Sequence, residues 1–162
     1  ASRNIDLTVI MVNNYIYGMT GGQKSPSTPK GSVTKTSPFG SIDEPINGCK
    51  LVMALGASYV ARWTTAHPVQ LAKSIEEGLM HKGFSFIEVL SQCPVQAGKS
   101  VYGEKDPAKI MQGYKEGTYL YKEGKEAVDG KVPIGVFRND TEAEEYIEKI
   151  EAKLKEQGIE RE

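Results

Sequence analysis

Cysteine and histidine are scarce in this sequence, and their scarcity excludes two common kinds of structural site. A chain of 162 residues can build its own core without a disulfide framework, and it has only two cysteines, Cys49 and Cys93. We therefore interpret both as thiols or ligands. Neither of the two histidines, His67 and His81, has a Cys, Asp or Glu at metal-ligand spacing, so we assign neither to catalysis.

The sequence also lacks an excess of either charge and a long apolar run. Its 20 basic and 21 acidic residues give a net charge of −1, which excludes an overall attraction to nucleic acid or to an anionic membrane. No apolar run approaches the roughly 20 residues of a membrane span, and no leader precedes the first expected strand. We expect a cytoplasmic protein of one ordinary domain, without nucleic-acid or membrane partners.

The most informative stretch begins with the apolar run 7–12, which is followed by Asn13, Asn14 and a glycine-rich turn. Such a run predicts a buried parallel strand that opens into a loop, and ligands of open α/β sheets bind at such loops. An Asn side-chain oxygen can bind a hard cation, and glycines let backbone N–H groups approach phosphate. Asn is equally typical of ordinary turns. From the residues alone, the stretch indicates either a diphosphate bound through Mg²⁺ or a plain turn.

The Asn-Gly stretch is one of several motifs that extend over nearly the whole chain. They are, in order, Asn13-Asn14-x-x-Tyr17-Gly18-Met19-Thr20-Gly21-Gly22-Gln23, Thr28-Pro29-x-Gly31-x-x-Thr34-Lys35-Thr36-x-Pro38-x-Gly40, Gly56-Ala57-Ser58-Tyr59-Val60-Ala61-Arg62, His67-Pro68, Gln92-Cys93-Pro94 and Val132-Pro133-Ile134-Gly135-Val136. Together they resemble the β subunit of 2-oxoacid:ferredoxin oxidoreductases, especially the 2-oxoglutarate branch.

The resemblance implies cofactors and site residues. It implies that the Asn14 side-chain oxygen and the Ile16 backbone carbonyl bind the Mg²⁺ of thiamine diphosphate, and that Gly18, Met19 and Thr20 lie along this cofactor. It further implies that Cys93 binds a [4Fe-4S] cluster whose remaining ligands lie outside this segment. From the residues alone, a buried loop thiol is the favoured interpretation of Cys93, because one cysteine cannot hold a cluster that needs four ligands.

The resemblance also implies an activity and partners. With an α subunit, such a protein oxidatively decarboxylates a 2-oxoacid to an acyl-CoA and passes electrons through the cluster to ferredoxin. We favour 2-oxoglutarate as the substrate, while pyruvate and a branched-chain 2-oxoacid stay open. The segment alone is expected to be inactive, because the family pairs the Asn loop with an upstream Gly-Asp-Gly that the sequence lacks. The alternative is a non-catalytic interaction fragment or split subunit that binds no cofactor alone.

The predicted fold class is α/β, with a mostly parallel sheet, helices on its faces and a peripheral C-terminal helix. The expected strands are 7–12, 59–63 and 84–90, with an edge strand at 132–137, and the expected helices are 46–55, 68–82, 106–124 and 141–157. Thr141 and Glu144 have the spacing of a capping box for the last helix. We expect a thiamine-diphosphate-binding domain at 1–130, truncated at its N-terminus, and a C-terminal extension at 131–162.

Residues 24–46 form a long proline-punctuated segment without periodicity. Such segments are functional loops or flexible insertions, and the resemblance favours an ordered loop near the cofactor. Its Lys35 is a candidate partner for a phosphate or carboxylate, although most loop lysines are merely solvated.

Overall fold

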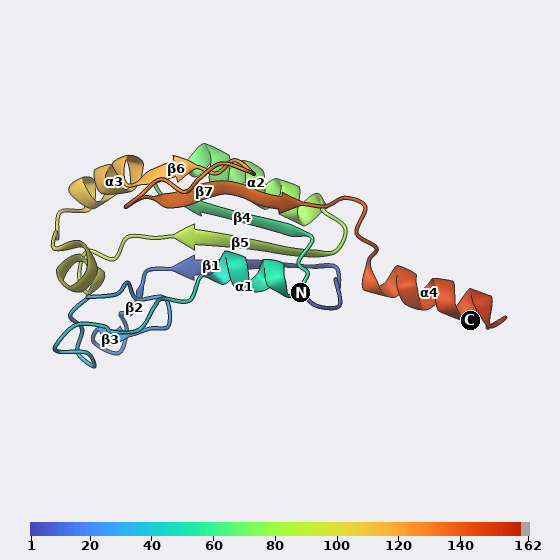
Figure 1. Cartoon of the computed structure of the whole chain (residues 1–162), viewed down its shortest axis with the longest axis horizontal. Helices are drawn as coiled ribbons and strands as arrows, with labels where there is room; N and C mark the ends of the chain where they lie inside the picture. The colour runs from blue at the N-terminus through green and yellow to red at the C-terminus, as the bar shows by residue number, and fades with distance from the viewer. Residues whose placement is uncertain (160–162) are drawn as a thin grey trace.

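Five strands form the main sheet of the computed structural model, which describes residues 1–159, in the order β1-β5-β4-β7-β6 (Figure 1). The strands are β1 (Leu7–Asn13), β4 (Tyr59–Thr64), β5 (Phe84–Leu90), β6 (Thr118–Leu120) and β7 (Val132–Asn139). β1, β5 and β4 are parallel, β7 is antiparallel to β4, and β6 is parallel to β7. The predicted mostly parallel α/β sheet is confirmed.

The two faces of the sheet are covered by α1 (Gly48–Ala54) and α2 (Pro68–Met80). Side chains alternate between the two faces of a strand, and β4 and β5 are buried on both faces, so most of their residues are apolar. One core cluster packs against Leu71 and Ile75 of α2, and the other contains Cys49 of α1. The expected helices at 46–55 and 68–82 are present, each ending slightly earlier than predicted.

The parallel strands all end at one edge of the sheet, at the left of Figure 1. Beyond that edge lie a two-stranded sheet of β2 (Ile16–Tyr17) and β3 (Gln23–Lys24), and a single π-helical turn, η1 (Gly98–Tyr102). The sequence predicts only a loop where η1 lies. This edge is where the sequence places the ligand site.

The chain after η1 departs from the predicted elements. α3 (Pro107–Glu116) ends well before the expected residue 124, and β6 then pairs with β7. As a result β7 lies inside the sheet, between β4 and β6, and the predicted edge position is wrong. The sequence does not reveal this pairing because a strand of three residues carries almost no periodic signal.

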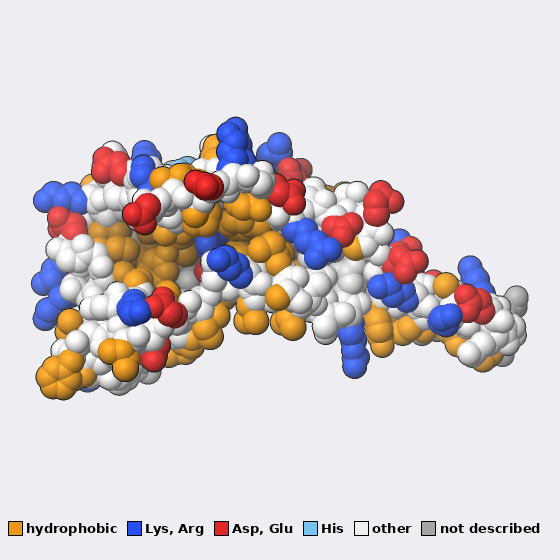
Figure 2. Space-filling view, viewed as in Figure 1, with side chains coloured by type: hydrophobic (Ala, Val, Ile, Leu, Met, Phe, Trp, Pro, Cys, Tyr) orange, Lys and Arg blue, Asp and Glu red, His pale blue; other side chains and the backbone are white. Residues whose placement is uncertain are grey.

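The last helix, α4 (Tyr146–Glu156), begins later than expected and extends away from the sheet, at the right of the view (Figure 1 and Figure 2). Its N-cap is Glu145, whose carboxylate accepts hydrogen bonds from the backbone N–H groups of Ile147 and Glu148. The predicted capping box of Thr141 and Glu144 is therefore wrong. The same carboxylate accepts a bond from Asp6 N at 3.1 Å, which fixes where the helix starts. Among residues 1–159, no helix has the length and apolarity needed to cross a membrane.

Candidate functional site

Two loops leave the sheet side by side at the carboxyl ends of β1 and β5. The strand register pairs Asn13 with Leu90, and the Ser91 N–H donates to the Asn13 carbonyl at 2.9 Å. The backbones of the two loops are therefore joined where they begin. In open α/β sheets, ligands bind at this kind of position.

Asn14, Gly18 and Cys93 come together between these loops. A Cβ atom built on Gly18 would lie 3.7 Å from the Cys93 Sγ and 3.8 Å from the Asn14 Nδ2. Both are ordinary contact distances, so the backbone at Gly18 lies close to both side chains. The structure thus gathers the predicted metal ligand and the predicted cluster ligand at one edge of the sheet.

The chain turns sharply through the two asparagines. The Asn13 Oδ1 accepts a hydrogen bond from Tyr15 N at 3.0 Å, and the Asn14 Oδ1 accepts one from Ile16 N at 3.3 Å. Tyr15 has a φ of 65°, a left-handed conformation that is unfavourable by about 1–2 kcal/mol for a residue with a Cβ. Both asparagines therefore have the turn role that their residue type predicts. An amide oxygen has two lone pairs, so this role leaves Asn14 able to bind a cation as well.

A glycine turn with a cation beside it follows. Gly21 and Gly22 have φ angles of 100° and 95°, which residues with a side chain rarely adopt. A Cβ atom on Gly21 would lie 3.2 Å from the Lys35 Nζ, and Lys35 N donates to the Gly22 carbonyl at 3.0 Å. The ammonium group of Lys35 therefore lies against the turn, next to the predicted cofactor residues. Met19 and Thr20 are exposed on this turn.

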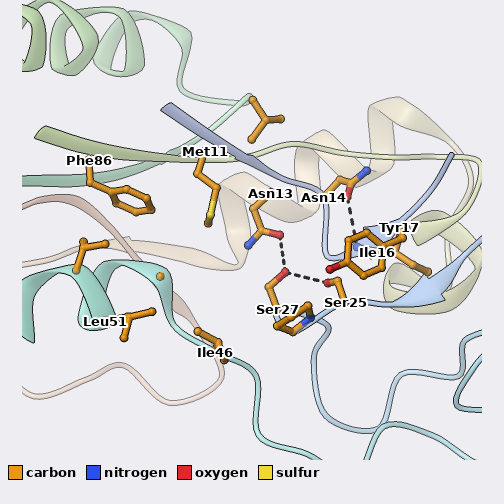
Figure 3. A pocket seen from close by; sticks show the side chains of 14 residues that line it. Met11, Asn13, Asn14, Ile16, Tyr17, Ser25, Ser27, Ile46, Leu51 and Phe86 are labelled. Carbon is orange, nitrogen blue, oxygen red and sulfur yellow. Dashed lines mark hydrogen bonds between the residues drawn. The ribbon is translucent and has the colours of Figure 1, made fainter. Parts of the chain in front are cut away.

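A cavity of 400 Å³ lies beside the asparagine turn (Figure 3). One end of it is polar, with the side chains of Asn13, Asn14, Ser25 and Ser27. Its other end is apolar and is formed by Met11, Ile46, Leu51 and Phe86. Gly18, Met19 and Thr20 do not line this cavity. The cavity can therefore hold a ligand with one polar and one apolar part.

A buried polar cluster lies directly under the turn, and the sequence does not predict it. Arg62 and Glu88 form an ion pair in the sheet, and Glu88 also accepts a hydrogen bond from Asn13. A second cavity, of 260 Å³, lies between this pair, the turn and Asn47. Burial raises the pKa of Tyr15, which also lines this cavity, above its usual value, so its hydroxyl stays protonated at neutral pH.

The long segment before α1 is ordered by its own hydroxyl groups. Ser25, Thr28 and Thr34 are buried, although they are polar, and their hydroxyl groups are hydrogen-bonded. The Thr28 Oγ1 donates to Tyr15 O and accepts from Ser25 N at 2.8 Å, which ties the segment to the asparagine turn. The segment is thus a packed loop at the site, as the resemblance implies, and it supplies part of the cavity wall.

The histidines have structural contacts. The His67 Nδ1 lies 2.8 Å from the Thr64 Oγ1, and the His81 Nε2 lies 2.8 Å from the Ser58 Oγ. Burial lowers the pKa of both rings. Within residues 1–159, no three His, Cys, Asp or Glu side chains are grouped as a metal site requires. The described residues therefore supply no group of carboxylates for a cation at the Asn14 turn, and such a cation would be bound by other oxygen atoms.

A family model described as "Thiamine pyrophosphate enzyme, C-terminal TPP binding domain" matches residues 1–89. The match covers the asparagine turn, the glycine turn and most of β5. The chain belongs to this thiamine pyrophosphate enzyme family. Cys93 lies just beyond the matched residues, so its predicted role rests on the resemblance alone.

Curated relatives are similar over nearly all of the chain. The 2-oxoglutarate synthase subunit KorB of Methanocaldococcus jannaschii is 49% identical over 152 residues, which are 91% of this chain and 56% of that protein. The subunit of the same name from Archaeoglobus fulgidus is 43% identical over 151 residues, 92% of this chain and 53% of that protein. The chain therefore spans about half the length of these relatives, and the predicted likeness to β subunits of this enzyme class is confirmed.

A solved structure shows the same fold. It is 2-oxoglutarate:ferredoxin oxidoreductase from Magnetococcus marinus with 2-oxoglutarate, coenzyme A and succinyl-CoA bound, and the TM-score is 0.79 at 25% sequence identity. The similarity covers 99% of this chain and 56% of that one. The match confirms the expected fold class over the described elements.

Thiamine diphosphate fits the residues of the turn. Diphosphate with Mg²⁺ needs oxygen ligands and accessible backbone N–H groups, and thiamine needs an apolar surface. The turn supplies an amide oxygen at Asn14 and glycines in left-handed conformations, and the cavity adds the apolar wall. The individual roles of Asn14, Ile16, Gly18, Met19, Thr20 and Cys93 remain predictions.

One sequence feature could have indicated the buried pair of Arg62 and Glu88. Arg62 and Glu88 are the only charged residues in β4 and β5, which otherwise have the composition of buried strands. A single charge in such a strand must find a partner, because an unpaired buried charge is very unfavourable. Two neighbouring parallel strands with opposite charges therefore point to a buried pair.

Proposed function

We propose that the chain forms part of the β subunit of a 2-oxoacid:ferredoxin oxidoreductase, which converts 2-oxoglutarate and CoA to succinyl-CoA together with an α subunit. The relatives and the solved structure with this printed activity support the proposal. The observation that carries it is that Asn14 lines a cavity with one polar end, while Asn14 and Cys93 both lie close to the Gly18 backbone.

The proposed division of work follows from the site. When bound, thiamine diphosphate supplies the carbanion-stabilising chemistry of decarboxylation. Asn14 and the Ile16 carbonyl bind its Mg²⁺, and Gly18, Met19 and Thr20 lie along it. The packed loop and the apolar end of the cavity exclude water from the site, which strengthens the electrostatic contacts within it. Lys35 supplies a positive charge next to the glycine turn, where an anionic group of a substrate can bind.

Cys93 extends the proposal to electron transfer. It is a partly exposed free thiol in a Cys-Pro turn, and in the complete subunit it would be one of four ligands of a [4Fe-4S] cluster. The Cys93 Sγ lies 3.7 Å from where a Cβ atom on Gly18 would be, and this closeness to the turn supports the proposal. A short path from the cofactor to the cluster, and on to ferredoxin, suits the proposed reaction.

Substitution of Asn14 in the complete enzyme tests the proposal. Asn14→Leu removes the oxygen ligand while keeping a side chain of similar size, so the Kd of thiamine diphosphate in the presence of Mg²⁺ should rise at least about tenfold. Titration of the purified apoenzyme measures this. The matched control is Asn139→Leu, an exposed asparagine at the end of β7 that pairs with Tyr59 at the start of β4, at the opposite end of the sheet. Equal affinity in the Asn14→Leu enzyme and the wild type would favour the interaction-fragment alternative.

A further inference from the structure

Arg62 and Glu88 form an ion pair in the interior of the sheet. They are 5% and 2% exposed, they face each other on the neighbouring strands β4 and β5, and the Arg62 Nε donates to the Glu88 Oε2 at 2.6 Å. Moving two charges from water into a protein interior is so unfavourable that well-packed apolar residues are often at least as stable. Stability alone therefore does not explain this pair.

Glu88 holds the asparagine turn from below. Its Oε1 accepts a hydrogen bond from the Asn13 Nδ2 at 2.7 Å. The Asn13 Oδ1 in turn accepts hydrogen bonds from Tyr15 N at 3.0 Å and from the Ser27 Oγ at 2.8 Å (Figure 3). Every polar group of the Asn13 side chain is therefore engaged. Its orientation, and with it the start of the turn that carries Asn14, depends on Glu88.

Arg62 holds the first helix. The Arg62 Nη2 donates to the Asn47 Oδ1 at 2.7 Å. Asn47 is the N-cap of α1, and the same oxygen accepts from Lys50 N at 3.1 Å. Cys49, in the first turn of α1, adds a weak bond from its Sγ to the Glu88 Oε2 at 3.4 Å. The pair is therefore joined to the N-terminus of α1 at two places.

The two ends of this network are opposite walls of one cavity. The 400 Å³ cavity is lined on one side by Asn13 and Asn14, and on the other by Gly48 and Leu51 of α1. In Figure 3 the asparagines and Leu51 lie across the cavity from each other. The pair thus sets the relative position of the two walls. The left-handed Tyr15 needs such support, because strained backbone persists only where its surroundings determine it.

We propose that Glu88 and Arg62 are positioning residues for the cofactor turn: their buried pair fixes the Asn13–Tyr15 turn against the N-terminus of α1. This presets Asn14 and the cavity for a Mg²⁺-bound diphosphate. The inference rests on the proposed function, since it concerns the same site. Neither side chain lines the 400 Å³ cavity. Outer-shell groups of this kind commonly determine the affinity of the site that they orient.

Glu88→Gln in the complete enzyme tests the turn side of the network. A glutamine has one acceptor oxygen, while Glu88 now accepts from both Asn13 and Arg62. One of these donors must lose its partner. We expect the Kd of thiamine diphosphate, titrated with saturating Mg²⁺, to rise about 10- to 100-fold. At saturating cofactor, kcat should return close to the wild-type value.

Arg62→Lys tests the helix side and keeps both charges. Lysine can pair with Glu88, but it lacks the planar fork that bonds Glu88 and Asn47 together. The same rise in Kd is expected, and this variant decides the question if Glu88→Gln does not fold. Asp140→Asn is the matched control for Glu88→Gln, because it makes the same carboxylate-to-amide change in the pair of Arg138 and Asp140 at the surface. It should leave the Kd of thiamine diphosphate unchanged.

The readouts separate the proposals. A lower melting temperature of the apoenzyme with an unchanged Kd in either folded variant shows a purely structural role and overturns the inference. A wild-type enzyme that does not bind thiamine diphosphate with Mg²⁺ overturns the proposed function instead. A raised Kd that the control does not share supports the positioning role.

Discussion

At the scale of single residues, two neighbouring asparagines have different partners. The residue types predict both a turn and a cation ligand for this pair, and the structure assigns Asn13 fully to the turn. Asn14 keeps an available oxygen lone pair beside the cavity. The sequence could predict the location of the site because the turn follows an apolar run that forms a strand of the parallel sheet. It could not predict that Asn13 binds Glu88, since the two are far apart in the chain and only the strand register joins them.

The two cysteines also differ in their surroundings, and we expect only the replacement of Cys93 to affect an iron-sulfur cluster. Cys93 is partly exposed at the strand edge, whereas Cys49 is buried in α1 and burial raises the pKa of its thiol. Thiolate ligation needs an accessible sulfur that can lose its proton. In the complete enzyme, Cys93→Ala should lose or convert the [4Fe-4S] cluster, measured as iron content and by electron-spin resonance, and it should abolish ferredoxin reduction. Thiamine-dependent decarboxylation should fall less.

Cys49→Ala is the control for this experiment. It removes a small buried side chain and a weak bond to Glu88, so we expect a loss of about 1 kcal/mol in unfolding free energy and an unchanged iron content. Iron that persists in Cys93→Ala, or disappears only in Cys49→Ala, would refute the assignment of the cluster ligand.

At the scale of elements, the sequence predicts the positions of strands well and the ends of the later helices poorly. β1 and β5 match their expected ranges closely, because both are mostly apolar runs. Only β5 is buried on both faces, whereas β1 is the edge strand of the sheet and exposes Leu7, Ile10 and Val12, so the expected burial of 7–12 is wrong. The predicted end of α3 and the predicted start of α4 are wrong. α3 stops because the chain joins a ladder with β7, and α4 starts where Glu145 bonds Asp6. Both boundaries depend on long-range partners that no local pattern contains.

Two helical glycines should respond to alanine in opposite directions. A Cβ atom on Gly78 of α2 would lie 2.8 Å from the Cδ1 of the buried Ile87, whereas one on Gly113 of α3 would meet nothing within 4 Å. Gly78→Ala should destabilise by about 1–3 kcal/mol through overpacking, less the gain in helix propensity. Gly113→Ala should stabilise by about 0.5–1 kcal/mol. Urea unfolding of the complete subunit measures both, and a stabilising Gly78→Ala would show that α2 does not pack tightly on the sheet.

At the scale of the whole molecule, the buried Asn4 joins its separate parts. The Asn4 Nδ2 donates to the Glu144 carbonyl at 3.0 Å, and its Oδ1 accepts from the Ser58 Oγ at 2.7 Å and from Phe84 N at 2.9 Å. The N-terminal segment, β4, β5 and the approach to α4 therefore meet at one side chain. The sequence predicts the layers of the fold from burial, but a junction of this kind is visible only in three dimensions.

Protonation of His81, which lies beside this junction, should destabilise the folded protein, because burial disfavours the charged ring. Its Nε2 lies 2.8 Å from the Ser58 Oγ, the group that bonds Asn4. Burial lowers the pKa of His81, although Asp140 and Asp6 oppose the shift. The unfolded chain therefore binds a proton more readily than the folded one. The folded state keeps its full stability above the unfolded pKa of about 6.5 and loses stability as the pH falls below that value.

The test is the melting temperature of the complete subunit between about pH 7.5 and 5.5, above the range where carboxylates titrate. The wild type should melt at lower temperatures as the pH falls through this window, and His81→Gln should reduce the slope, because glutamine can still donate to Ser58 but does not titrate. Burial also lowers the pKa of His67, so His67→Gln should remove a further part of the slope. If the double variant keeps the wild-type slope, the acid destabilisation arises from groups other than these two buried histidines.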